Sequence, residues 1–207
     1  VRNTNGLPYA VRKQGAGLAN LVSASTTPAY ILTYDRVDGS IMDKSTIELG
    51  DDPTKSGVYT LKFSIQNFSG STLSYKLSAH VMTEGVSETK TSPGETTVTE
   101  DGYMLDGAVV TFTVEGGSKN GDVVTVAGKS TADVTVTITL SDKDKAYLDE
   151  SFKNGMYVEG FVVLEATEGT EIDLSAPYLA FYGDWTVAPI FDRDFYETNA
   201  DELNDAI

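Results

Sequence analysis

The chain lacks cysteine and carries one histidine, and these shortages exclude several kinds of chemistry. Without cysteine there is no disulfide framework, no thiolate nucleophile and no thiolate metal site. A Ser–His–Asp triad needs an imidazole as its base, and His80 is the only histidine in the sequence. His80 lies within the run LSAHVM, and the nucleophile motif GxSxG is absent. We therefore interpret His80 as an ordinary strand residue and expect no catalytic residue in this chain.

Basic residues are also scarce. Fifteen Lys and Arg stand against 31 Asp and Glu among 207 residues, which gives a net charge of −16. A surface this acidic repels nucleic acid and anionic membranes, so neither is expected as a partner. The sequence has no apolar run approaching the roughly 18 residues that a membrane-spanning helix requires, so no membrane-spanning segment is expected.

Motifs for phosphate or metal binding are missing as well. The segment AGKST at 127–131 would need a glycine five positions before Gly128 to match a phosphate-binding loop, but Val123 stands there. Acidic groups such as Asp142 and Asp144 lack the spacing of a calcium loop and are interpreted as a solvated face. We therefore expect no cofactor and no metal site.

What the sequence does contain is a repeated strand pattern. Threonine and valine recur in alternating runs, which is the period of half-buried strands and not that of helices. Segments rich in Gly, Asn, Asp and Ser separate these runs and supply turns. The pattern predicts an all-β fold, a fibronectin type III or immunoglobulin-like β-sandwich. The runs expected to form strands are 58–65, 72–82, 108–114, 122–128, 131–140 and 157–166.

Two short helices and three regions complete the predicted organisation. The helices are expected near 15–24 and over 141–154, where Ser141 caps the start of the second. The polar stretch 83–102 is interpreted as a long hairpin or a mobile loop. We divide the chain into an N-terminal segment at 1–24, a sandwich at 25–188 and a linker toward a following domain at 189–207.

Two separated stretches resemble one family. The segment YAVRKQGAGLANLVSA at 9–24 resembles the end of the catalytic domain in large cell-envelope serine proteases of the subtilisin type. The segments NGMYVEGFVVLEA at 154–166 and LSAPYLAFYGDWTVAPIFD at 174–192 resemble the fibronectin type III-like domain that follows it in streptococcal C5a peptidases and lactococcal cell-envelope proteinases. The family's catalytic Asp, His and Ser motifs have no counterpart here, so the resemblance implies an inactive piece of a larger endopeptidase.

The resemblance also implies a role and a location. In such proteases the first sandwich packs against the protease domain and helps to orient protein substrates, on the bacterial surface as a secreted or cell-wall-anchored enzyme. The expected partners are thus an upstream protease domain of the same polypeptide and the parent's protein substrates. The residues expected at the interdomain contact are Gln14, Gly15, Gly17, Leu18, Tyr182, Gly183 and Trp185.

An alternative function stays open at this point. An independent adhesive or carbohydrate-binding sandwich of a bacterial surface protein would need an exposed aromatic platform, and Tyr178, Phe181, Tyr182 and Trp185 lie close together in sequence. Alternate residues of a strand face opposite sides, so some of these rings should be packed inside. We therefore favour core and domain contact over sugar binding for this segment.

Overall fold

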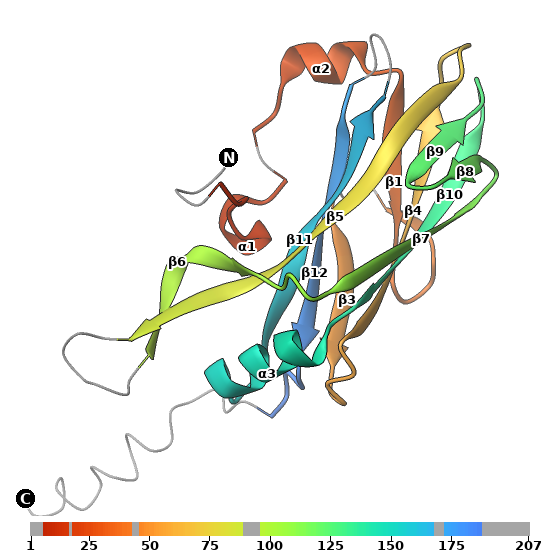
Figure 1. Ribbon diagram of the computed structural model, residues 1–207. Helices are drawn as coiled ribbons and strands as arrows, with labels where there is room; N and C mark the ends of the chain where they lie inside the picture. The colour runs from red at the N-terminus through yellow and green to blue at the C-terminus, as the bar shows by residue number, and fades with distance from the viewer. Residues whose placement is uncertain (1–5, 17, 43–45, 89–95, 168–171, 188–207) are drawn as a thin grey trace, which may run out of the picture.

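Two β-sheets pack face to face in the computed structural model (Figure 1), which describes residues 6–16, 18–42, 46–88, 96–167 and 172–187. The five-stranded sheet has the order β2-β1-β4-β10-β7, and the seven-stranded sheet has the order β3-β12-β11-β5-β9-β8 with β6 paired to β5. The expected all-β sandwich is confirmed. The strands are β1 (Ala29–Tyr34), β2 (Ile41–Met42), β3 (Ile47–Asp52), β4 (Val58–Asn67), β5 (Leu73–Glu88), β6 (Thr96–Met104), β7 (Val109–Glu115), β8 (Ser118–Asn120), β9 (Val123–Val126), β10 (Thr131–Thr139), β11 (Met156–Ala166) and β12 (Leu174–Tyr182).

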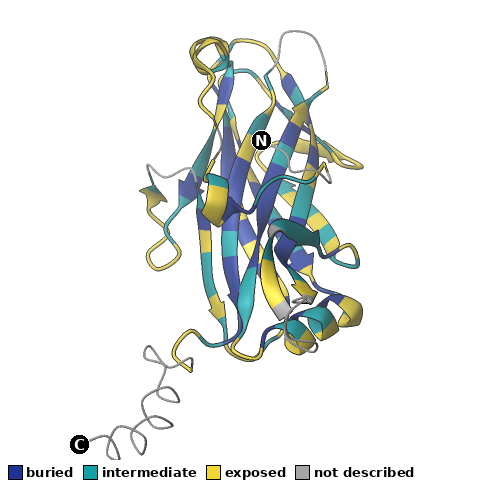
Figure 2. Ribbon diagram, turned by 90° about the vertical axis from the view of Figure 1, so that its left-hand side faces the viewer, coloured by how far each residue is buried: buried dark blue, intermediate teal, exposed yellow. Residues whose placement is uncertain are grey.

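The alternation seen in the sequence places the core between the sheets. In β4 the buried face carries Tyr59, Leu61, Phe63 and Ile65, and most of the intervening residues face outward. β10 lies beside β4 in the same sheet and repeats this pattern, with four apolar residues buried along nine positions. Figure 2 shows the buried residues along the middle of the strands and the exposed ones in turns and helices. Burial of these alternating apolar faces is the main force that holds the sheets together.

Three short helices are described, and one sequence expectation changes. The helix expected near 15–24 is present only in its second half, as α2 (Leu21–Thr26), and a separate turn, α1 (Val11–Gln14), precedes the expected range. Gly15 ends α1 with a φ of 61°, a left-handed conformation that stops a helix. The second expected helix is present as α3 (Asp142–Ser151), and Ser141 and Asp144 form a reciprocal capping box at its start.

A hairpin projects from one edge of the sandwich (Figure 1). It consists of the last part of β5 and of β6, which pair with each other from Met82–Met104 outward to Glu88–Thr96. We call this pair of strand segments the hairpin arm. The polar stretch 83–102 is thus a hairpin wherever the structure describes it, while its turn at 89–95 lies outside the described residues.

Within the described residues, no helix is long and apolar enough to cross a membrane. The same part of the chain holds no cluster of three or more His, Cys, Asp or Glu side chains arranged to bind a metal ion.

Candidate interdomain contact

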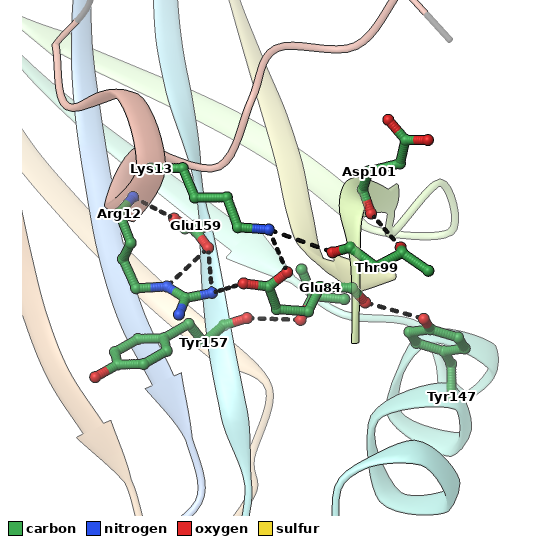
Figure 3. Close-up of polar contacts among 9 residues, drawn as sticks. Arg12, Lys13, Glu84, Thr99, Asp101, Tyr147, Tyr157 and Glu159 are labelled. Atoms are coloured by element: carbon green, nitrogen blue, oxygen red, sulfur yellow. Dashed lines mark hydrogen bonds and ion pairs between the residues drawn. The ribbon is translucent and has the colours of Figure 1, made fainter. Parts of the chain in front are cut away.

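The N-terminal segment is fixed to the sandwich by four charged side chains. Arg12 and Lys13 of α1 meet Glu84 of β5 and Glu159 of β11, and we call this group the basic clasp (Figure 3). The Nε and Nη2 atoms of Arg12 donate to Oε1 of Glu159 at 3.0 and 2.9 Å, and Nη2 also donates to Oε1 of Glu84. Lys13 Nζ donates to Oε2 of Glu84 at 3.1 Å. The clasp thus joins residues that are more than seventy positions apart in sequence.

The carboxylates of the clasp are buried, which makes their pairing costly to break. Glu159 is 0% exposed and Glu84 is 3% exposed. An ionised carboxylate without a partner is strongly disfavoured in such a place. Two positive charges face two negative charges, so the group is balanced only while α1 lies against the sheet. Removing one partner of a buried pair typically costs about 3–5 kcal/mol.

The fold of α1 itself contributes to the contact. Ala10 and Val11 are buried, and α1 packs against β11 and β12. The backbone N–H of Arg12, which has no partner within so short a helix, donates to Oε2 of Glu159 at 3.0 Å. Both oxygens of Glu159 are therefore occupied by the same residue, through its side chain and its main chain.

A cluster of aromatic rings continues the contact surface. Tyr157, Phe181 and Trp185 lie with ring centroids 4.7 to 5.3 Å apart, and we call them the aromatic ridge. The guanidinium carbon of Arg12 lies 4.2 Å from the centroid of the Tyr157 ring. Arg12 therefore contacts the ridge as well as the clasp carboxylates, and the Tyr157 ring links it to the rings of Phe181 and Trp185. A cleft of about 310 Å³ runs along the other side of the ridge, beside β3.

The residues of the first expected motif occupy varied positions. Gln14 holds the start of the segment, because its Nε2 donates to the carbonyl of Tyr9 at 2.6 Å. Gly15 provides the left-handed turn after α1, Leu18 is 89% exposed, and Gly17 lies outside the described residues. Leu21 and Val22 of α2 are exposed too. Whether these positions form an interdomain contact stays a prediction.

The residues of the second expected motif lie at the end of β12. Tyr182 is buried, and its hydroxyl donates to Oδ2 of Asp149 at 3.3 Å. Burial and the nearby Asp149 carboxylate raise the pKa of Tyr182 to about 12. Gly183 has a φ of 136° and would place a Cβ 3.1 Å from Gly155 Cα, so a side chain is strained there. Trp185 is 60% exposed and packs against the ring of Phe181.

Sequence reasoning missed the basic clasp. Arg12 and Lys13 stand directly before QGAGL, and Glu159 interrupts the apolar run YVEGFVV. A carboxylate at an interior position of a buried strand is a signal that some cation must approach it, because such groups are rarely buried unpaired. The identity of that cation depends on the tertiary fold.

The base of the hairpin arm is held from two sides. On one side Tyr147 of α3 donates its hydroxyl to the carbonyl of Glu84 at 2.9 Å and stacks on Tyr103 with centroids 3.8 Å apart. On the other side Lys13 donates to the carbonyl of Thr99 at 3.3 Å (Figure 3). The arm therefore has a defined direction relative to α1.

Comparisons with known proteins show which proteins this chain is similar to. The PI-type proteinase of Lactococcus lactis subsp. cremoris and the PII-type proteinase of Lacticaseibacillus paracasei are each 25% identical to this chain over 193 residues. The match covers 92% of the chain and 9% of each proteinase, so the chain spans only a small part of these curated relatives. The resemblance to the lactococcal cell-envelope proteinases is thereby confirmed.

Solved structures give a weaker likeness. A family 123 glycoside hydrolase from Clostridium perfringens aligns with 10% identity and a TM-score of 0.41, over 74% of this chain and 26% of that one. An overlap at this level carries no argument about function. A family model described as an Fn3-like domain, in contrast, matches residues 47–179, which is most of the sandwich. The chain therefore belongs to the Fn3-like domain family.

Proposed function

We propose that this chain is a noncatalytic accessory domain of a subtilisin-like serine endopeptidase, secreted or anchored at the bacterial cell wall. Its role is to support an upstream protease domain and to help position protein substrates. The observation that carries the proposal is the basic clasp, which fixes the segment resembling the end of a catalytic domain onto the sandwich. The relatives' names as proteinases, and the small fraction of them that the chain matches, support a longer parent protein.

The scarcity of histidine supports the noncatalytic role. The one histidine lies in the middle of β5, where its carbonyl accepts a hydrogen bond from the Tyr178 hydroxyl at 2.8 Å. The contact role is supported by the ridge, where Trp185 extends the surface of the Arg12 contact outward.

Sugar binding is the less favoured alternative. A carbohydrate platform needs several exposed rings. Of the four rings in this segment, Tyr178, Phe181 and Tyr182 are buried and Trp185 is exposed. One ring that leans against its neighbours offers a small stacking surface. We therefore place the aromatic segment in the domain contact.

The test compares variants of the parent polypeptide. Trp185→Ala and Arg12→Ala are introduced separately, with Lys119→Ala as the control, because Lys119 is an exposed basic residue in β8 away from the clasp. Cleavage of a large protein and of a short peptide is measured for each. A loss with the protein alone indicates substrate positioning, and a loss with both, together with a lower melting temperature, indicates support of the protease domain. Unchanged cleavage of both substrates in both variants would refute the proposal.

A further inference from the structure

We propose that Glu84, Glu159 and Tyr157 form a receptor site for a guanidinium group, and that α1 is its built-in ligand. The N-terminal segment and the sandwich then constitute one folding unit. The folding of this unit is a property of the chain by itself. Any effect of the site on the activity of an upstream protease domain rests on the proposed function.

The geometry of the site fits a guanidinium better than an ammonium. One planar group reaches two carboxylates through Nε and Nη2 while its face covers the Tyr157 ring at 4.2 Å. Arginine offers five donors in a rigid plane and stacks on aromatic rings, whereas lysine is a compact charge with neither property. The neighbouring Lys13 contacts Glu84 but not Glu159, in agreement with this difference.

The receptor depends on its ligand because of where the carboxylates lie. Glu159 pairs across β11 with Leu179 of β12 and Met82 of β5, so strands enclose it on both sides. Within the described residues, the ion pairs of Glu84 and Glu159 are all made with α1. If α1 leaves, two buried negative charges remain next to each other, and the sheet around them is destabilised.

This dependence moves the boundary of the folding unit. The sequence places the start of the sandwich at residue 25, and the family model begins at 47. The buried residues Ala10 and Val11 and the clasp instead make residues 10–14 part of the sandwich. A chain that begins after them lacks the counterions of its own core.

Chemical rescue of an emptied site tests the receptor directly. Arg12→Ala is made in the full 207-residue chain, and thermal unfolding is followed in buffers of equal ionic strength that contain methylguanidinium or methylammonium. We expect the ratio of folded to unfolded protein to fall about 100-fold or more in this variant. Methylguanidinium should raise the melting temperature of the variant more than that of the wild type, and methylammonium should not. Equal shifts with the two cations would overturn the inference.

A second variant keeps the test decisive. In Arg12→Ala/Glu159→Gln the unpaired charge of Glu159 is gone while Glu84 keeps its ion pair with Lys13. This chain should therefore be more stable than Arg12→Ala alone and should lose the response to methylguanidinium. If Arg12→Ala does not fold, Arg12→Lys replaces it and should be less stable than the wild type, because an ammonium cannot reach both carboxylates while it covers the Tyr157 ring. Stability equal to that of the wild type would then contradict the receptor. A double variant that is simply the sum of its single variants would contradict the receptor. If methylguanidinium rescues Arg12→Ala as expected but the cleavage by the parent polypeptide is unchanged, the receptor stands and the proposed function is refuted.

Discussion

Gly160 in β11 is the position at which the packing of the seven-stranded sheet should be least tolerant of a side chain. It pairs with Tyr178 of β12 and Val81 of β5. The Tyr178 side chain reaches across it to donate to the His80 carbonyl at 2.8 Å. A Cβ at position 160 would lie 1.9 Å from that carbonyl oxygen and 3.1 Å from the Tyr178 hydroxyl.

The cost of Gly160→Ala follows from these distances. A Cβ essentially never approaches another heavy atom within 3.0 Å, so the backbone of β5 or β11 has to move by about 1 Å. Overpacking costs about 1–3 kcal/mol, and loss of the Tyr178 bond to a buried carbonyl adds about 1–3 kcal/mol. We expect a loss of about 3–5 kcal/mol from a domain stability of about 5–15 kcal/mol.

Urea denaturation measures this loss, with circular dichroism for the sheets and the fluorescence of Trp185, the only tryptophan in the chain. Gly70→Ala is the matched control, because no heavy atom lies within 4 Å of a Cβ built at that exposed turn position. The control should stay within about 0.5 kcal/mol of the wild type. A Gly160→Ala chain less than about 1 kcal/mol below the wild type would refute the reasoning.

Three further predictions concern single side chains, and urea denaturation measures each of them. Tyr59→Phe should be neutral or slightly stabilising, because its buried hydroxyl has no hydrogen-bond partner among the described residues; a loss above about 1 kcal/mol would contradict this. Ser141→Ala should lower the free energy of unfolding by about 1 kcal/mol, because it removes the cap of α3, whereas Ser141→Thr keeps a capping hydroxyl and should lose much less. Equal losses in the two variants would contradict a capping role. The free energy of unfolding should fall as the pH rises from 10 to 12, because the raised pKa of Tyr182, about 12, keeps it protonated in the folded chain while its unfolded form ionises near 10. Tyr182→Phe should reduce that slope, and an unchanged slope would exclude Tyr182 as its source.

The sequence was a good guide where structure depends on local periodicity. β10 alternates along its whole length and β4 along its first six residues, so their buried apolar faces follow from the residue pattern. The start of α3 was also visible, because Ser141 and the acidic residues after it form a local capping signal. The first helix was placed too early, because the apolar residues after Gly15 suggested a helix from residue 15 onward, whereas α1 ends at Gln14 and α2 begins only at Leu21.

The contact surface was less accessible because it depends on pairings that are remote in sequence. Arg12 meets Glu159 across 147 positions, and nothing in the residues around either one names the other. The parallel pairing of β3 with β12 is hidden in the same way, since the two strands are separated by most of the chain. The motif residues Tyr182 and Trp185 lie near each other in sequence, yet one is buried and the other exposed.

The unusual length of β5 has a mechanical consequence. This single strand of 16 residues is hydrogen-bonded to β11 and β9 within the seven-stranded sheet, and it continues into the hairpin arm, where its register with β6 shifts between Glu84 and Val86. A pull on the arm along the strand would load the β5–β11 ladder in shear, where many hydrogen bonds share the force at once. A force on the arm would thus be transmitted to a central strand of the sheet, next to the point where Glu84 holds α1.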